Sequence, residues 1–329
     1  MPPQRTQSWQ HTLAALGPTF APLAGIAFTL ILFWCIAPDR FLSPADLRTI
    51  AVSSVVVGTA AIGMTLIILA GGIDLSVGSV VALSGIVCAL SLRAGHPLVI
   101  ALPLALAAGA LCGLYNGALI AFLRLPSFLV TLGTLGLFRG VAKWLSSSRT
   151  VSAPTHGLDA LMLPTPPTPL WVVAPGVWIL LALAIAAAFL ISRTVHGCHF
   201  TAIGDNPAAA RYAAIPIRAR TLQVYALGGC AAGLAGILQF GRVTVGDPSI
   251  SVGLELDVIA AVVIGGGSLA GGRASIAGTV LAALLMALLR NRFVAVGWPN
   301  FVQEIIVGHI IILAVAADAL RRRLGSAAQ

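Results

Sequence analysis

Long apolar runs separated by short polar breaks fill most of the chain. A transmembrane helix needs about 20 mainly apolar residues to cross the hydrocarbon core of a bilayer. Runs of this kind recur from Pro18 onward. The pattern predicts an all-α polytopic membrane protein with about ten transmembrane helices and a broken helix near Gly71–Gly78. The expected spans are about 18–37, 49–70, 77–92, 98–122, 127–145, 171–191, 221–240, 255–269, 274–290 and 300–319.

Composition supports this class of protein. Of the 329 residues, 58% are hydrophobic and only 9% are charged, whereas soluble domains carry roughly 25% charged residues. A water-soluble fold is therefore excluded. We expect a cytoplasmic N-terminal tail at 1–17, a transmembrane domain at 18–319 and a cytoplasmic C-terminal tail at 320–329.

The stretch Gly71-Gly72-Ile73-Asp74-Leu75-Ser76 interrupts the apolar pattern between the second and third spans. Two glycines weaken a helix, and Asp74 can cap a new helix beginning near Leu75 by accepting hydrogen bonds from N–H groups of its first turn. Non-helical backbone at membrane depth is tolerated only against protein or a wet cavity. One hypothesis is therefore a broken element beside a solute pathway. The alternative is a tight turn at the membrane surface, with Asp74 as a simple cap.

Positive charge is carried almost wholly by arginine, and Lys143 is the only lysine. Cytoplasmic loops of membrane proteins are enriched in basic residues. With the N-terminus inside, the loop 192–220 and the C-terminal tail also fall inside. Inside segments then hold ten arginines, against about seven outside. The net charge of +9 indicates contact with an anionic lipid bilayer and no role in nucleic-acid binding.

The loop 192–220 contains signals for a short exposed helix. Asp205 or Asn206 suits the N-cap, Pro207 suits the first helical turn, and Pro216 stops the helix. About two turns result, and Arg211 offers a polar contact on them. Such a helix docks a soluble partner or, as the alternative, lies on the bilayer surface.

Several kinds of chemistry are excluded or unsupported. A Walker-type phosphate-binding loop needs a lysine after a glycine-rich turn, and the residues before Lys143 lack that pattern. The run His196-Gly197-Cys198-His199 has no second ligand pair, so we predict no metal site. The carboxylates Asp257 and Glu304 near span ends are proton relays or, alternatively, caps and partners for arginine.

Four blocks of sequence resemble the permease subunits of bacterial ATP-binding-cassette (ABC) sugar importers of the ribose, xylose, arabinose and galactose type. The stretch Gly71 to Gly78 matches the family's glycine-glycine-isoleucine-aspartate-leucine-serine signature without a gap. The other blocks are Gly113-Leu114-Tyr115-Asn116-Gly117 with Pro126-Ser127-Phe128, then Ala202-Ile203-Gly204-Asp205-Asn206 with Ala209-Ala210-Arg211-Tyr212, and finally Glu255-Leu256-Asp257 with Gly271-Gly272-Arg273. The resemblance covers about Thr49 to Ala316.

The resemblance implies an inner-membrane permease and not an enzyme. It would pair with a second permease copy or paralogue, bind ATP-binding subunits, and receive a monosaccharide from a periplasmic sugar-binding protein. ATP and magnesium would bind to the ATP-binding subunit, and this chain would bind no cofactor. The coupling residues implied by the family pattern are Gly204, Asp205, Asn206, Ala209, Arg211 and Tyr212.

Sugars carry no charge, so their pathway needs hydrogen-bonding groups more than a fixed counter-ion. Our candidates for the substrate pathway are Gly71, Gly72, Asp74, Ser76, Ser79 and Asn116. An ion-coupled secondary transporter of a small polar solute, using Asp74 or Glu304, is the alternative function. A membrane scaffold that moves no solute is a third.

Overall fold

A computed structural model describes residues 5–37, 42–165 and 172–326. Almost all of the regular structure in these ranges is helical, with one short 3-10 helix and one pair of two-residue strands. The elements are α1 (Arg5–Ile36), α2 (Pro44–Leu69), α3 (Val77–Arg93), α4 (Leu98–Leu123), α5 (Ser127–Leu145), β1 (Val151–Ser152), η2 (Asp159–Met162), α6 (Pro175–Arg193), α7 (Val195–Asp205), α8 (Pro207–Tyr212), α9 (Ile217–Val243), β2 (Val245–Gly246), α10 (Leu254–Ile264), α11 (Ile276–Val296) and α12 (Asn300–Ser326).

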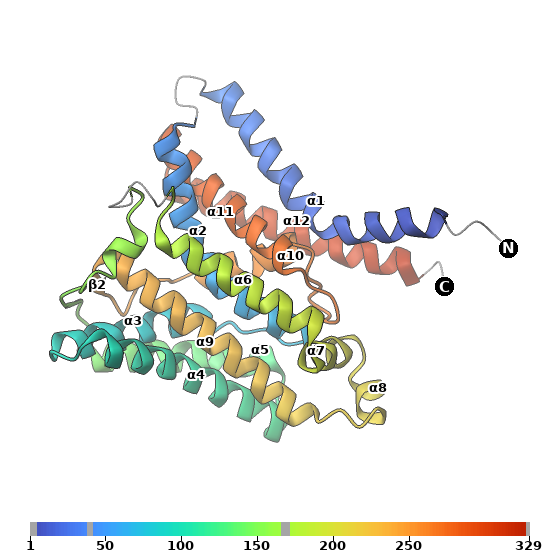
Figure 1. The fold of residues 1–329 in the computed structure, drawn as a ribbon, viewed down its shortest axis with the longest axis horizontal. Helices are drawn as coiled ribbons and strands as arrows, with labels where there is room; N and C mark the ends of the chain where they lie inside the picture. The colour runs from blue at the N-terminus through green and yellow to red at the C-terminus, as the bar shows by residue number, and fades with distance from the viewer. Residues whose placement is uncertain (1–4, 38–41, 166–171, 327–329) are drawn as a thin grey trace.

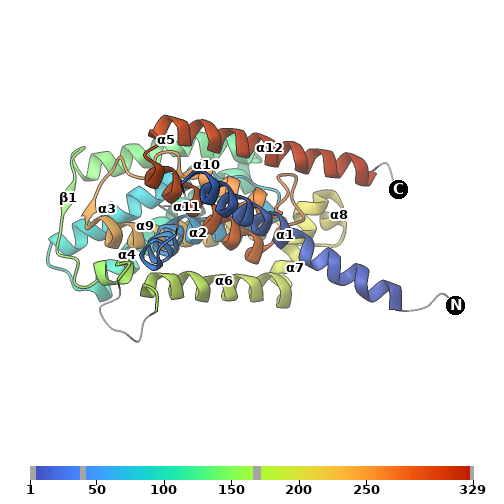
Figure 2. The ribbon, with the colours of Figure 1, turned by 90° about the horizontal axis from the view of Figure 1, so that it is seen from above.

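Nine of the predicted spans coincide with apolar helices among the described residues. Helices α2, α4, α5, α6, α9 and α11 are long and apolar enough to cross a membrane, and shorter apolar segments lie in α1, α3 and α12. The predicted all-α polytopic membrane fold is therefore confirmed. Figures 1 and 2 show α7, α8 and the C-terminal end of α12 toward one end of the molecule, and the strands toward the other. We name these ends the α8 face and the β face.

The segment predicted as a span at 255–269 is different. Helix α10 has only 11 residues, which rise about 16 Å, about half of the hydrocarbon thickness. Glycines from Gly265 onward end the helix, and the chain then continues without regular structure to α11. On the way, the Gly272 N–H donates to the carbonyl oxygen of Leu69 over 3.0 Å. A half-length helix with an irregular extension therefore replaces the expected span.

Other boundaries also differ from the prediction. Helix α1 begins at Arg5 inside the expected tail 1–17, and α12 runs to Ser326 inside the expected tail 320–329. The loop 192–220 contains α7, which we did not predict, in addition to the expected short helix. Strands β1 and β2 pair antiparallel and join two loops of the β face. Residues 1–4, 327–329 and the end of the proline-rich loop at 166–170 lie outside the described residues.

Helices α4 and α9 pack closely through glycines on both sides of their contact. A Cβ added at Gly109 would lie 2.8 Å from the Gly233 Cα, and one added at Gly229 would lie 3.0 Å from the Gly113 Cα. Small residues four positions apart allow membrane helices to approach backbone to backbone. This contact fixes α9 beside α4, where its side chains reach the broken element.

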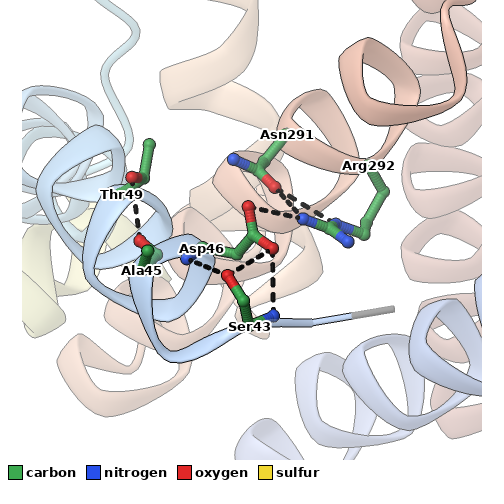
Figure 3. Close-up of polar contacts among 6 residues, drawn as sticks. All are labelled: Ser43, Ala45, Asp46, Thr49, Asn291 and Arg292. Atoms are coloured by element: carbon green, nitrogen blue, oxygen red, sulfur yellow. Dashed lines mark hydrogen bonds and ion pairs between the residues drawn. The ribbon is translucent and has the colours of Figure 1, made fainter. Parts of the chain in front are cut away.

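A polar cluster joins the first turn of α2 to the end of α11 (Figure 3). Ser43 and Asp46 form a capping box, in which Ser43 Oγ accepts from the Asp46 N–H and Asp46 Oδ2 accepts from the Ser43 N–H. Arg292, whose side chain is 2% exposed, pairs with Asp46 Oδ1 over 3.2 Å and donates to Asn291 Oδ1. A buried arginine thus ties together two helices that are far apart in the sequence.

Candidate functional site

The element between α2 and α3 begins with a glycine turn. Gly71 has φ +80°, in the left-handed region that favours glycine. Its N–H donates to the Ile68 carbonyl, and the Gly72 N–H donates to the Ile67 carbonyl, both over 2.9 Å. This pair of bonds is the Schellman arrangement that ends many helices. Helix α3 then begins at Val77, at the predicted start of the third span and two residues after the start near Leu75 that was expected if Asp74 capped it.

Asp74, Ser76 and Asn116 form a buried hydrogen-bonded cluster, which we call the Asp74 cluster. Asp74 is 4% exposed, and Ser76 and Asn116 are fully buried. Asp74 Oδ1 accepts from the Ser76 N–H over 2.8 Å and from Ser76 Oγ over 2.6 Å. Asn116 Nδ2 donates to Ser76 Oγ over 2.9 Å. Asp74 therefore orders the backbone before α3, although it does not accept from the first helical turn as predicted.

Side chains from two other helices, α5 and α9, hold the same element. The Ile73 N–H donates to Ser127 Oγ, and the Ile73 carbonyl accepts from Thr131 Oγ1 and Tyr225 Oη over 3.2 and 3.3 Å. Ser79 Oγ donates to the carbonyl of Leu135 over 2.8 Å. Tyr225 lies about two turns inside α9, or about 12 Å. The open backbone therefore lies within the helical bundle, which favours the broken element over a surface turn.

A small cavity of about 180 Å³ adjoins the break. Gly71 and Gly72 line it together with Ser127 and Tyr225. Asp74, Ser76, Ser79 and Asn116 do not line it. Asp74, Ser76 and Asn116 bond to one another, and Ser79 Oγ bonds to the Leu135 carbonyl. Asn116 Oδ1 is buried without a hydrogen-bond partner among the described residues. The six pathway candidates thus divide into two glycines at a cavity and four side chains that frame the break.

A larger pocket of about 520 Å³ opens near the β face, between α2, α9, α10 and α11; we call it the outer pocket. Arg290 Nη2 pairs with Asp257 Oδ2 over 2.6 Å, and Arg242 Nη2 donates to Ser53 Oγ over 3.3 Å. An arginine partner for Asp257 was one of the alternatives open from the sequence. The pocket itself was missed, because its lining residues come from four segments whose rotation no local pattern reveals.

The short exposed helix that the sequence predicts in the loop 192–220 is present as α8. Asn206 Oδ1 accepts from the N–H groups of Ala208 and Ala209, each over 3.0 Å, and Pro207 occupies the first turn. Asn206 is thus the N-cap, one of the two residues predicted for it. The helix has 6 residues and ends at Tyr212, ahead of Pro216. Five of the six coupling candidates are exposed, namely Asp205, Asn206, Ala209, Arg211 and Tyr212.

Gly204, the sixth candidate, is buried where three backbones meet. A Cβ at this position would collide with the Leu69 carbonyl oxygen and lie 2.5 Å from the Gly272 nitrogen. A Cβ added at Gly71 would lie 3.5 Å from the Gly204 Cα. The end of α7 therefore rests directly on the end of α2, next to the broken element. Only glycine permits this approach without moving a backbone.

Polar side chains clamp α7 to the start of α9. His196 Nδ1 contacts Gln223 Oε1 over 2.9 Å, and Arg220 donates to both Gln223 Oε1 and His199 Nδ1. These histidines are therefore engaged by side chains of α9. The clamp holds α7, and with it α8, in a defined position against the bundle.

One known protein family matches most of this chain in sequence. Residues 47–315 match a family described as "Branched-chain amino acid transport system / permease component". The chain belongs to this permease family. The match runs from the first turn of α2 into α12 and includes the break, α8 and the outer pocket. The chain is thus a multi-pass membrane permease, a transport component with no enzymatic role of its own.

The permease is similar to several importer subunits along most of its length. It is 39% identical to the ribose import permease protein of Escherichia coli (strain K12) over 259 residues, covering 78% of this chain and 80% of that one. It is 35% identical to the L-arabinose ABC transporter permease protein of Azospirillum brasilense, covering 87% and 83%. The fructose import permease protein of Rhizobium meliloti is 32% identical, covering 97% and 90%. No solved structure matches the chain.

Proposed function

We propose that this permease is the membrane-spanning subunit of an ABC importer that carries a monosaccharide across the bacterial inner membrane. ATP and magnesium bind to a separate ATP-binding subunit, and a periplasmic sugar-binding protein delivers the solute. A second permease copy or a paralogue completes the pore. Three relatives whose names refer to ribose, arabinose and fructose support the substrate class.

The observation that carries the proposal is the contact of Gly204 with Leu69 and Gly272. Helix α8 is exposed and follows α7 directly. A partner that binds α8 and moves it therefore also moves the end of α7. Gly204 transmits this movement to the end of α2, where Gly71 and Gly72 line the small cavity. Force applied at the α8 face thereby reaches the break over a short chain of backbone contacts.

We assign the inner part of the solute pathway to the break. Gly71 and Gly72 form its wall, and the Asp74 cluster with Ser79 holds the non-helical backbone in shape. The outer pocket receives the solute on the β face. Arginine, carboxylate and amide groups suit sugar hydroxyls, because each offers several hydrogen bonds in one plane. Within the outer pocket, Arg290 neutralises Asp257 as an ion pair, and Arg242 donates to Ser53 Oγ.

Reconstitution into vesicles tests the proposal. The permease, the ATP-binding subunit and the sugar-binding protein are incorporated, and uptake of labelled pentoses and hexoses is measured with and without ATP. We expect uptake only when all three proteins and ATP are present. Uptake by the permease alone, driven by a proton or sodium gradient, would refute the proposal and favour the ion-coupled alternative.

A variant isolates the role of α8. The double substitution Asn206→Ala with Arg211→Glu removes the N-cap and reverses an exposed charge. We expect a folded protein in which ATP hydrolysis continues but sugar uptake falls at least tenfold. The matched control, Arg149→Glu, reverses an exposed arginine after α5 and should leave uptake unchanged. Normal uptake by the double variant would contradict the coupling role.

A further inference from the structure

A hollow of about 980 Å³ lies on the α8 face between the end of α4, α8 and the start of α9; we call it the inner hollow. Three arginines line it, one from each of these regions: Arg124, Arg211 and Arg218. Figure 1 shows these segments converging at one end of the molecule. Of the three, only Arg211 is among the predicted coupling residues, and Arg124 and Arg218 have no part in the transport function proposed above.

The charge of the inner hollow is unbalanced. No carboxylate lines it, and Asp205 is the only acidic residue in the loop 192–220. Among the described residues, the side chains of Arg124, Arg211 and Arg218 have no hydrogen-bond or ion-pair partner. Single exposed arginines are commonly solvated, but three around one hollow concentrate positive potential there. This positive potential favours an anionic ligand.

The walls of the same hollow are mainly apolar, and Ile120, Leu125, Ile203 and Ile217 are among the side chains that form them. An inorganic anion or a nucleotide would leave these apolar side chains exposed to water. A molecule that combines an anionic group with hydrocarbon satisfies both the arginines and the walls. The ligand chemistry is thus that of an anionic amphiphile.

The position of the hollow identifies the source of this amphiphile. It lies where α4 ends, and the apolar side chains of Phe122, Leu123 and Phe128 beside it are exposed, as lipid-facing side chains are. Basic pockets between transmembrane helices on the cytoplasmic side bind anionic lipid headgroups. We infer that the inner hollow binds an anionic phospholipid of the inner leaflet, with its phosphate among the three arginines and its acyl chains along the end of α4.

This inference goes beyond the transport proposal and rests on it in one respect, namely that the α8 face is the cytoplasmic face. Pro207 and Arg211 of α8 line the hollow, so a bound lipid contacts the helix that we assign to coupling. The lipid would fill the space between α8 and the ends of α4 and α9.

The test measures lipid retention by the full chain alone, so its outcome does not depend on the transport result. The detergent-solubilised protein is incubated with phosphatidylglycerol or phosphatidylcholine, and bound lipid is counted by native mass spectrometry. We expect phosphatidylglycerol to be retained in preference. Substituting two arginines, Arg124→Gln with Arg218→Gln, should weaken its binding about thirtyfold, from the contribution of two basic groups near a membrane surface.

Controls separate charge from folding and from other ligands. Arg124→Lys with Arg218→Lys keeps the charge and should retain the lipid, whereas Arg149→Gln lies elsewhere and should behave as the unaltered protein. Equal retention of both lipids, or no loss in the glutamine variant, would overturn the inference. Complete displacement of the lipid by millimolar inorganic phosphate would also overturn it, since a free anion would then suffice. If the glutamine variant retains the lipid but no longer associates with the ATP-binding subunit, the inference is overturned and the hollow is assigned to contact with that subunit.

Discussion

Replacing Ser76 by alanine tests whether the Asp74 cluster frames the break. The substitution removes the hydroxyl that donates to Asp74 over 2.6 Å and accepts from Asn116 over 2.9 Å. The lost bond to a carboxyl group is worth about 1.5–3 kcal/mol, and the buried amide left without a partner costs about 1–3 kcal/mol more. Relaxation lowers the sum, so we expect a loss of about 3 kcal/mol in the free energy of unfolding.

Ser84 provides a matched control in the same helix. Its side chain is fully buried, like that of Ser76, but its Oγ has no hydrogen-bond partner among the described residues. Ser84→Ala removes a buried hydroxyl that forms no bond, which is neutral or slightly stabilising. Both variants lose one buried serine hydroxyl, Ser76 from the N-cap of α3 and Ser84 from α3 itself. The difference between their losses of stability therefore measures the contribution of the hydrogen bonds in the Asp74 cluster.

Thermal unfolding of the detergent-solubilised protein, followed by tryptophan fluorescence, measures this difference. At about 2 °C per kcal/mol for a large domain, Ser76→Ala should lower the Tm by about 6 °C and Ser84→Ala by about 0 °C. Equal shifts for the two variants would refute the reasoning, because burial alone would then explain the loss. A large loss for Ser84→Ala alone would refute it as well.

Two further predictions concern contacts between distant segments. Gly204→Val forces a side chain against the Leu69 carbonyl and should abolish correctly folded protein in size-exclusion chromatography, whereas Gly133→Val, which adds a side chain where no atom lies within 4 Å, should be tolerated. A double-mutant cycle of Asp46→Asn and Arg292→Met should give a coupling energy of about 1 kcal/mol in unfolding measurements; additive effects would contradict the ion pair.

Parts of the fold could be predicted from the sequence, because they depend on interactions between residues close together in the chain. The apolar runs located nine of the helices, because only a helix satisfies its own backbone within a single segment in lipid. Asp205 or Asn206 before Pro207 predicted the start of α8, since an N-cap bond joins residues two or three apart. Gly71 and Gly72 predicted the end of a helix, since the hydrogen bonds that end a helix also join residues only a few positions apart.

Other features required distant residues to meet. The length of α10 was misjudged because its glycine-rich extension is apolar enough to resemble a span. Helix α7 was missed because its polar face contacts Arg220 and Gln223 on α9, so its sequence resembles a loop. The buried position of Gly204 depends on Leu69 and Gly272, neither of which is near it in the chain.

By itself, the sequence determined that this protein spans a membrane with mostly helical segments, where its main break occurs, and that a short capped helix begins near Pro207. Each of these depends on the transfer of side chains from water or on hydrogen bonds within one helical turn. The tertiary structure alone decided that Asp74, Ser76 and Asn116 meet in one buried cluster, that arginines line both the outer pocket and the inner hollow, and that α7 rests on α2. These depend on the rotation and depth of each helix against its neighbours, which are set by packing over the whole bundle.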